Sequence, residues 1–382
     1  MIGSTQFCNR PDEKEGALRH ASMLDVRMRW IENASLQSLN TFGVAARARV
    51  LAAIDQPEDI RTLNRLAPPG EGPRWVLGGG SNVLFLEDFP GLILFNQIKH
   101  LRFYSLDGEG AVSVGGGVSW HALVMETLAR GWGGLENLAL IPGTCGAAPI
   151  QNIGAYGLEQ SDLFLGCQAV HLESGAYRWF EPEECHFGYR QSVFKGALKG
   201  MYLITDVHYR LYRHRKPVCS YAVLQEALQT RGITDPTPRQ VAVAVIRIRR
   251  SKLPEPDRVG NAGSFFKNPL VDVAQAEALR AQYPQLRTFP VSDHQVKIPA
   301  AWLIDQCGWK GYREGPVGCN PRQPLVLVHY GGGTGADIAS LAQRIAWSVY
   351  ERFGIVLEPE VQFIGASVPA TMYPDWPARP SA

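Results

Sequence analysis

Short hydrophobic runs and amphipathic segments alternate along most of the chain, and glycine-rich turns separate them. Residues 47–53 and 74–77 are hydrophobic runs of strand length. Residues 57–66 lie between them and begin with proline and two acidic residues, which are typical of the first turn of a helix. The pattern predicts a βα unit, then a strand that enters the glycine turn Gly78–Asn82, and a further strand at 83–86.

A second region begins near residue 99 and repeats this arrangement. Residues 111–117 predict a strand that runs into glycines, and Ser119 is placed to N-cap a helix that Gly131 ends. Further strands are predicted at 167–173, 177–180 and 202–212. In the last of these, one face carries Leu203, Thr205, Val207 and Tyr209.

A third region follows a proline-bounded junction. A helix with Val241, Val245 and Ile248 on one face ends just before Pro254 and Pro256. Beyond the prolines, helices at 273–282, 300–307 and 337–353 and a strand at 325–330 predict a small α/β unit. The resulting segments are a disordered extension (1–35), two α+β subdomains (36–98 and 99–247), a smaller α/β domain (248–355) and a C-terminal segment (356–382).

The stretch 141–157 contains no charged residue and is rich in glycine, alanine and proline. It is a poor helix and a poor strand, and its small residues leave room for a flat partner against the main chain. We interpret it as a cofactor wall; a buried crossover loop is the alternative. The turn Gly78–Asn82 suits the phosphates of such a cofactor, although a glycine-rich turn alone is weak support. The similar turn Gly331–Gly335 precedes a threonine-capped helix and needs no ligand.

Composition excludes several classes of protein. The chain has 38 basic and 36 acidic residues, and its net charge of +2 predicts no binding to nucleic acid or to an anionic membrane surface. The first 30 residues lack the apolar core of a signal peptide, so we expect a cytoplasmic protein. Seven dispersed cysteines without a Cys-x-x-Cys pair indicate neither a disulfide framework nor a metal site.

Five motifs occur in one order: Gly78–Asn82, the block 134–157, Gly188–Arg190, Asn261–Pro269 and Leu357–Glu360. In this combination, from about Leu36 to Gly365, the chain resembles the UDP-N-acetylenolpyruvoylglucosamine reductases, in their longer type with a tyrosine-containing substrate loop. The resemblance implies an α+β protein with a two-subdomain FAD-binding fold like that of vanillyl-alcohol oxidase (the PCMH type). It also implies a smaller C-terminal α/β substrate-binding domain.

The resemblance further implies a reaction. The family uses NADPH and non-covalent FAD to reduce the enolpyruvyl ether of UDP-N-acetylglucosamine-enolpyruvate to UDP-N-acetylmuramate, a peptidoglycan precursor. Hydride passes from FAD to the vinyl carbon, and a serine protonates the neighbouring carbon. An enol ether accepts hydride only if its carboxylate takes up the developing charge, so a cation and a proton donor must lie there. We expect the partners to be these two substrates alone, and the protein to be a monomer.

Site residues follow from the matching motifs. The resemblance implies that the catalytic residues are Arg190, Ser264 and Glu360, the last in its protonated form. We infer in addition that the nearby cation of Lys267 assists Ser264. The cofactor-binding residues are Gly78, Gly79, Gly80, Ser81, Asn82, Ile141, Pro142, Gly143, Gly146, Ala147, Ile150 and Gly154. The substrate-binding residues are Tyr189, Tyr221, Lys252, Asn268 and Gln323. No metal ligand is implied.

Two positions depart from the family pattern, and two other functions stay open. Alanines at 147 and 148 replace a serine that relatives often carry, and Phe289 replaces a tyrosine. One alternative is an FAD-dependent sugar or alcohol oxidase with a histidine-tethered flavin, although His121, the histidine nearest a glycine turn, lies inside a predicted helix. The other is a non-catalytic nucleotide-sugar-binding protein.

Overall fold

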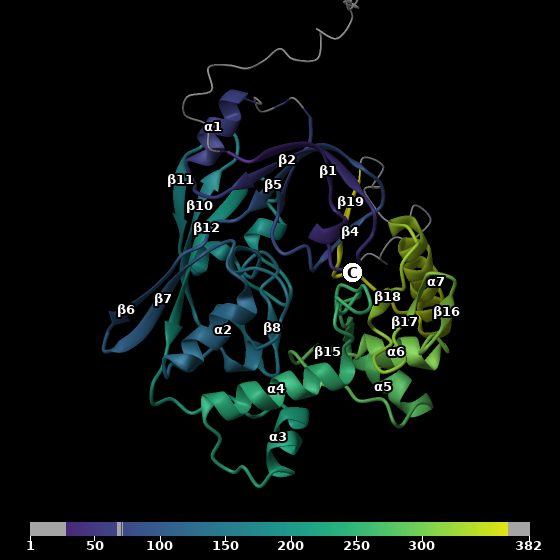
Figure 1. Ribbon diagram of the computed structural model, residues 1–382. Coiled ribbons are helices and arrows are strands. Elements are labelled where there is room, and N and C mark those ends of the chain that lie inside the picture. Colours follow the sequence, from purple (N-terminus) through teal and green to yellow (C-terminus); the bar gives the residue numbers. More distant parts are fainter. Residues whose placement is uncertain (1–27, 67–69, 71, 366–382) are drawn as a thin grey trace, which may run out of the picture.

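The first subdomain is built on a four-stranded sheet. The computed structural model describes residues 28–365 except 67–69 and 71, and Figure 1 shows its arrangement. The sheet has the strand order β1-β2-β5-β3, in which β1 is antiparallel to β2 and the other pairs are parallel. Its elements are β1 (Trp30–Ser35), β2 (Arg47–Ile54), α1 (Asp59–Leu66), β3 (Arg74–Leu77) and β5 (Phe89–Asn96). The predicted strands and helix of this region are confirmed.

The second subdomain is an antiparallel five-stranded sheet with the order β11-β10-β12-β7-β6. Its elements are β6 (Leu101–Leu106), β7 (Glu109–Gly115), α2 (Trp120–Ala129), β10 (Phe164–His171), β11 (Tyr177–Phe180) and β12 (Tyr202–Leu211). Ser119 caps α2 through its hydroxyl, as predicted. The predicted face of β12 is buried, but Ile204 on the opposite face is buried too, because it lines a cavity described below.

The third part begins with two helices under the second subdomain and continues into a compact α/β unit (Figure 1). Helix α7 buries Ile338, Leu341, Ile345 and Val349 against this unit, as the hydrophobic spacing predicts. Thr334 caps α7 with its side chain, so the turn Gly331–Gly335 has a structural role. The helices are α3 (Ala222–Gln229), α4 (Pro238–Lys252), α5 (Val273–Gln282), α6 (Ala300–Gln306) and α7 (Gly335–Phe353). The strands are β13 (Leu270–Asp272), β14 (Phe289–Pro290), β15 (Gln295–Lys297), β16 (Arg313–Glu314), β17 (Val317–Cys319) and β18 (Leu327–His329).

Two predicted segment limits differ from the structure. Residues 30–35, assigned to the extension, form β1, which pairs with β2 over most of its length; residues 1–27 lie outside the described part. The limit at residue 248 falls inside α4, which continues to Lys252. A prediction from local pattern places boundaries less well than elements, because tertiary pairing decides where an edge strand starts.

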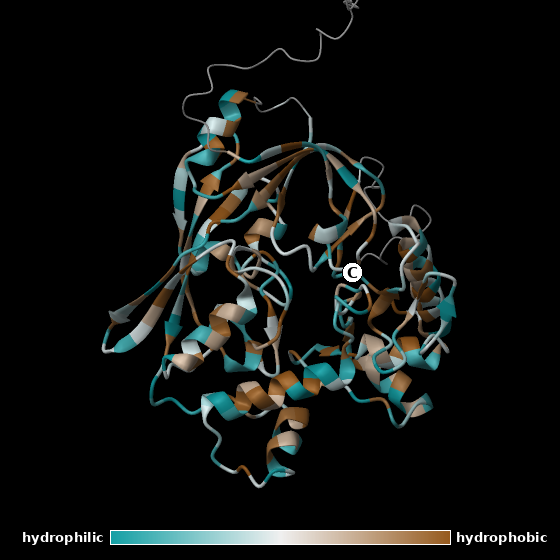
Figure 2. Cartoon of the chain, viewed as in Figure 1, coloured by the Kyte–Doolittle hydropathy of each residue, from teal (hydrophilic) through white to brown (hydrophobic). Residues whose placement is uncertain are grey.

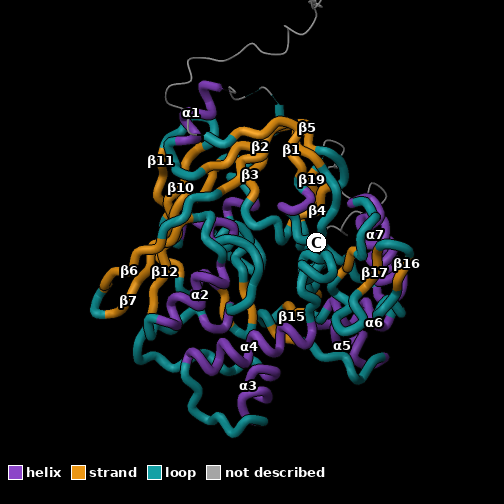
Figure 3. The backbone as a smooth tube through the Cα atoms, in the orientation of Figure 1, coloured by secondary structure: helices purple, strands orange, loops and turns teal. Residues whose placement is uncertain are grey.

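The C-terminal segment returns to the first subdomain. Strand β19 (Gln362–Ile364) pairs in parallel with β4 (Val83–Phe85), and the Gln362 N–H donates to the Asn82 carbonyl at 3.0 Å. Glu360 is thereby brought next to the Gly78–Asn82 turn. Figure 3 shows that loops from all three parts meet in the middle of the molecule.

Hydrophobic side chains form separate cores on the two sides of these loops, one within the α/β unit and one under the five-stranded sheet. In Figure 2 hydrophobic positions follow the strands of the first sheet and alternate with hydrophilic ones along α7. Among the described residues, no helix combines the length and the apolar character that a membrane crossing needs. The six cysteines in the described part are free thiols.

Candidate active site

A cavity lies between the two subdomains and receives residues from both. It encloses about 1150 Å³, including its open mouth. Residues 74–83 line one side. The residues that line the other side include 142–144, 146–148, 150, 151, Phe194, Tyr202 and Ile204. Ten of the twelve predicted cofactor residues are in its lining, and the two that are not are Ile141 and Gly154. Ile141 packs against the core of the second subdomain, and the Gly154 carbonyl accepts a hydrogen bond from Arg190.

The turn Gly78–Asn82 packs directly on the uncharged stretch. A Cβ atom on Gly79 would lie 2.8 Å from the Cα atom of Gly143, closer than any real Cβ contact. Gly80 has φ of +62°, a conformation that favours glycine. The two loops therefore need glycine at their contact, because a side chain on Gly79 would strike the backbone of Gly143 and push the loops apart.

The uncharged stretch satisfies its own backbone through the start of α2. The Gly146 N–H donates to the Gly116 carbonyl at 2.9 Å, the Cys145 N–H to Val118 at 2.9 Å, and the Trp120 N–H to Gly143 at 3.0 Å. Between these bonds the Thr144 hydroxyl is buried, and it has no hydrogen-bond partner within the described residues. An unpaired buried hydroxyl beside a glycine-lined cavity is what a polar, planar ligand such as FAD would complete.

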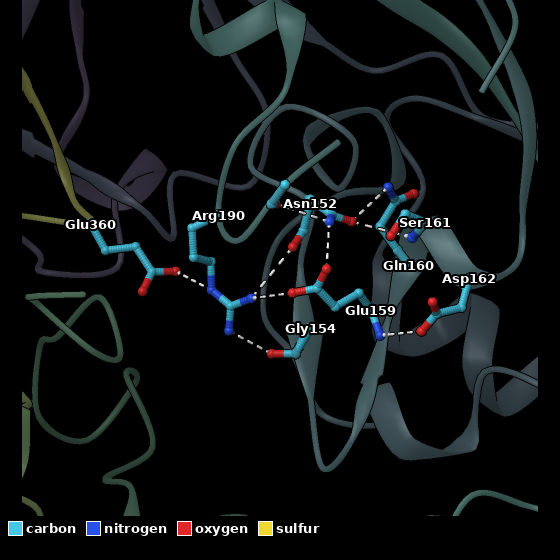
Figure 4. A network of polar contacts seen from close by, with 9 residues as sticks. Asn152, Gly154, Glu159, Gln160, Ser161, Asp162, Arg190 and Glu360 are labelled. Carbon is cyan, nitrogen blue, oxygen red and sulfur yellow. Dashed lines mark hydrogen bonds and ion pairs between the residues drawn. The ribbon is translucent and has the colours of Figure 1, made fainter. Parts of the chain in front are cut away.

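Arg190 and Glu360 meet beside this cavity. The Arg190 Nε atom lies 2.9 Å from Glu360 Oε1, and the two side chains are only 17% and 15% exposed. Figure 4 shows Glu360 reaching Arg190 from the C-terminal segment, on the opposite side from the other partners of the guanidinium. Arg190 itself has φ of +55°, a strained conformation for a residue with a side chain. Such strain persists where surrounding contacts fix the residue, and these contacts are numerous.

The guanidinium of Arg190 is fixed by the second subdomain. Its Nη2 donates to the Gly154 carbonyl at 2.6 Å, its Nη1 donates to the Asn152 carbonyl at 3.4 Å, and Nη1 lies 3.8 Å from Glu159 Oε1. The Asn152 side-chain amide donates to Glu159 Oε2 at 2.8 Å (Figure 4). Burial raises the pKa of Glu159, while Arg190 opposes that rise. The orientation of Arg190 is therefore set before any substrate binds.

Ser264 lies on the segment that holds Glu360. The Glu360 N–H donates to the Phe265 carbonyl at 2.8 Å, and the Asn82 side-chain amide donates to the Glu360 carbonyl at 3.1 Å. Lys267 pairs with Glu358 at 3.2 Å. The structure thus brings together three distant segments that carry the predicted catalytic residues. Lys267, the predicted assistant of Ser264, forms an ion pair with a carboxylate instead of being free.

The predicted substrate residues surround the same region at different distances. The Tyr189 hydroxyl accepts hydrogen bonds from the backbone and the side chain of Asn268, and burial raises the pKa of Tyr189. Lys297 lies over the Tyr189 ring at 4.7 Å. Tyr221 directly precedes α3 at the N-cap position and is 43% exposed, with its ring edge-to-face against Tyr156.

Lys252 and Gln323 lie on two segments that run side by side. Lys252 is the exposed last residue of α4, and the side chain of Arg322 donates to the Ser251 carbonyl at 3.3 Å. Ser251 precedes Lys252 in the sequence and Arg322 precedes Gln323, so this bond holds the two segments next to each other. Neither residue contacts the Arg190–Glu360 pair among the described contacts, so their role stays a prediction.

Sequence reasoning missed several residues of this site. They are Gln151, Asn152, Glu159, Lys195 and Lys297. Glu159 could have been found, because it is the first charged residue after the uncharged stretch. The others carry no local signal, since their neighbours come from remote segments.

Comparisons with known proteins agree with this geometry. Residues 255–364 match the profile of the UDP-N-acetylenolpyruvoylglucosamine reductase C-terminal domain, and residues 48–181 match that of an FAD binding domain. The chain is 49% identical over 328 residues to the UDP-N-acetylenolpyruvoylglucosamine reductase of Burkholderia multivorans, which covers 85% of this chain and 94% of the relative. The chain belongs to the UDP-N-acetylenolpyruvoylglucosamine reductase family.

Solved structures extend the likeness to the whole fold. A UDP-N-acetylenolpyruvylglucosamine reductase from Thermus caldophilus is similar with a TM-score of 0.60 and 25% identity, over 89% of this chain and 99% of that one. A 6-hydroxy-D-nicotine oxidase from Arthrobacter nicotinovorans, at 16% identity and a TM-score of 0.50 over 89% of each chain, shares the fold alone. The predicted family, the fold class, an oxidoreductase and FAD as its cofactor are thereby confirmed.

The flavin-tethering alternative has no support in the cavity. Neither histidine nor cysteine is among the residues that line it in the described part of the chain. His121 lies in α2, where its Nδ1 accepts a hydrogen bond from the Leu140 N–H at 3.0 Å. A covalent link to FAD through a histidine would need a side chain at the cavity wall.

Proposed function

We propose that this chain reduces UDP-N-acetylglucosamine-enolpyruvate to UDP-N-acetylmuramate with electrons from NADPH. The observation that carries this proposal is the pair formed by Arg190 and Glu360, joined at 2.9 Å beside the FAD cavity. A reductase of an enolpyruvyl ether needs charge at the substrate carboxylate, next to the cofactor. A module that only binds nucleotide sugars would not need a buried arginine held by four groups.

Arg190 and Glu360 bind the carboxylate of the enolpyruvyl group. As hydride adds to the terminal vinyl carbon, negative charge develops over the adjacent carbon and this carboxylate. The guanidinium, fixed by Gly154 and Asn152, stabilises that charge without having to reorient. Glu360, which pairs with the guanidinium at 2.9 Å, would accept a proton when the substrate binds and then donate a hydrogen bond to the same group.

Ser264 completes the reduction by giving a proton to the carbon that bears the carboxylate. The hydroxyl is a weak acid, but the carbon that it serves is strongly basic at that moment. Overall the substrate gains a hydride and a proton, NADPH becomes NADP⁺, and solvent restores the proton to Ser264. A fixed direction of proton delivery gives a single configuration at the new centre.

The residues of the cavity fit FAD. The turn Gly78–Asn82 would hold the pyrophosphate through backbone N–H groups, and residues 142–147 would face the flavin ring. Bound FAD supplies the two-electron chemistry between NADPH and the sugar nucleotide. Tyr189, Tyr221, Lys252, Asn268 and Gln323 are proposed to hold the UDP-sugar. NADPH and the sugar would use the same side of the site in turn.

The decisive experiment is the oxidation of NADPH by the purified yellow protein. We expect it to depend on added UDP-N-acetylglucosamine-enolpyruvate and to yield UDP-N-acetylmuramate. A colourless protein that stays so after FAD is added would refute the proposal. Acid precipitation should release the flavin into the supernatant; colour in the pellet would support the tethered oxidase instead.

Two further properties stay predictions. We expect the protein to be a monomer, which analytical ultracentrifugation checks, and to reside in the cytoplasm, where its nucleotide substrates are made. Cell fractionation with an antibody against the native protein checks the second.

A further inference from the structure

Lys195 is a buried amine that none of the roles above uses. Its Nζ atom is inaccessible to solvent and has no hydrogen-bond partner among the described residues. No carboxylate of the described chain lies within 4.0 Å of it. An ammonium group with three unused donors is costly to bury, so natural proteins rarely keep one without a partner.

The charges around Lys195 are those of the catalytic site. Burial, followed by the charges of Lys267, Arg190 and Lys199, lowers the pKa of Lys195 to about 8, and Glu360 alone opposes this shift. Two other cations of the cluster lie within 4 Å of a carboxylate: Arg190 pairs with Glu360 and Glu159, and Lys267 pairs with Glu358. Glu360 cannot neutralise Lys195 as well, because it already pairs with Arg190. Of these three cations, Lys195 is the one without a carboxylate partner among the described residues.

The backbone around Lys195 is firmly held. Ser192 is buried, and its hydroxyl donates to the Ile150 carbonyl at 2.6 Å, which ties this turn to the uncharged stretch. The Lys195 N–H donates to the Ser192 carbonyl at 3.1 Å. Phe194 lines the FAD cavity and packs edge-to-face on Phe180 at 4.9 Å. The backbone that carries Lys195 is therefore held against the uncharged stretch and the cavity wall.

We propose that Lys195 is a second substrate-binding cation, which contacts the carboxylate of the enolpyruvyl group together with Arg190. The inference rests on the proposed function and assigns a residue that no motif indicates. The carboxylate would supply the missing acceptor of Nζ and a negative charge for this ammonium group. It would also explain a preference for sugar nucleotides that carry an acid group.

A pair of ligands separates this role from a general effect on binding. UDP-N-acetylmuramate carries the carboxylate, and UDP-N-acetylglucosamine lacks it. For Lys195→Met we expect binding of the first to the FAD-loaded protein, measured by calorimetry, to weaken about 10- to 100-fold, because a charge-assisted bond is lost. Binding of the second should change less than about twofold. Lys310→Met, which removes an equal charge from an exposed pair with Asp305, should alter neither.

The pH dependence gives a second test. Lys195 is protonated in the free protein below pH about 8 and loses its charge above it. Affinity for UDP-N-acetylmuramate should therefore fall as the pH rises above about 8, whereas affinity for UDP-N-acetylglucosamine should not follow this profile. In Lys195→Arg the fall should disappear, because a guanidinium stays charged. All variants keep the surrounding charged residues Lys267, Arg190, Lys199 and Glu360. If the affinity of Lys195→Arg still fell above pH about 8, the titration of one of these residues would be the cause.

Other outcomes overturn the proposal. If Lys195→Met bound both ligands equally more weakly, or bound both as tightly as the unaltered protein does, Lys195 would not contact the carboxylate. Loss of FAD from Lys195→Met, or failure of NADPH to reduce it, would assign the amine to the cofactor. Failure of the proposed function itself looks different, since the unaltered protein would then not turn over the enolpyruvyl sugar at all.

Discussion

The two sides of the active site are built in opposite ways. The wall made by residues 78–82 and 142–147 is uncharged, and its shape comes from glycines and backbone hydrogen bonds. The facing side carries Arg190, Lys195, Lys267 and Glu360, which arrive from three separate segments. The first side is continuous in sequence within two loops, whereas the second exists only after folding.

This difference follows from what each side has to do. A flat cofactor needs close approach and donors at fixed positions, which the main chain provides with little help from side chains. A fixed charge against the flavin would also bias its redox potential. Charge that develops on the substrate needs side chains of both signs, and their mutual orientation has to be set in advance. Substitutions on each side can test whether one side binds the cofactor and the other carries out the chemistry.

The largest effect should come from Ser264→Ala. We expect the rate of reoxidation by the enolpyruvyl sugar to fall about 10²- to 10⁴-fold, because the proton donor is lost. FAD content and reduction by NADPH should stay normal in stopped-flow measurements. Ser105→Ala, which changes an exposed hydroxyl, serves as the control. Normal turnover of Ser264→Ala would show that Ser264 is not the proton donor.

Arg190→Lys should come next, with a loss of about 10²- to 10³-fold in the same half-reaction. Lysine keeps the charge but cannot reach Glu360, Gly154 and Asn152 together. Glu360→Gln should also slow reoxidation by the enolpyruvyl sugar, while FAD stays bound. Arg130→Lys, in an exposed pair with Glu126, is the matched control. If either active-site variant instead lost FAD, the two sides would not be separable.

Gly79→Ala tests the uncharged side. The added Cβ would meet Gly143 at 2.8 Å, and overpacking costs about 1–3 kcal/mol, so we expect FAD to bind roughly 10- to 100-fold more weakly. With FAD in excess, the reoxidation rate should return to within about twofold. A rate that stays low at saturating FAD would show that the wall also governs the chemistry.

The smallest effect is expected for Glu159→Gln. This carboxylate lies 3.8 Å from Arg190 and accepts from Asn152, so its loss should slow reoxidation about threefold to tenfold. Because the pKa of Glu159 is raised, the unaltered protein should lose this contribution as the pH falls, and the variant should lack that acid-side decline. Glu184→Gln, in an exposed pair with Arg178, is the control. If Glu159→Gln lost activity at low pH as the unaltered protein does, a group other than Glu159 would cause the acid-side decline.

Local elements were the most predictable part of the fold. Strands β3 and β11 match their predicted limits, and α7 buries the predicted face. Strand β1 was missed, because an edge strand with mixed burial carries a weak pattern and is specified by pairing with β2. Helix α3 was missed as well, since it is short and follows a loop.

The sequence by itself determined the two glycine loops, their lack of charge and, through matching motifs, the family. Backbone geometry is encoded locally, because glycine and proline act on the dihedral angles of their own position. Only the tertiary structure decided that Glu360 lies 2.9 Å from Arg190 and that Glu159 and Asn152 hold the guanidinium. It also decided that Lys195 has no hydrogen-bond partner in the part of the chain that the structure describes. Charge interactions depend on distance through space, and the parallel pairing of β19 with β4 sets that distance across hundreds of residues of chain.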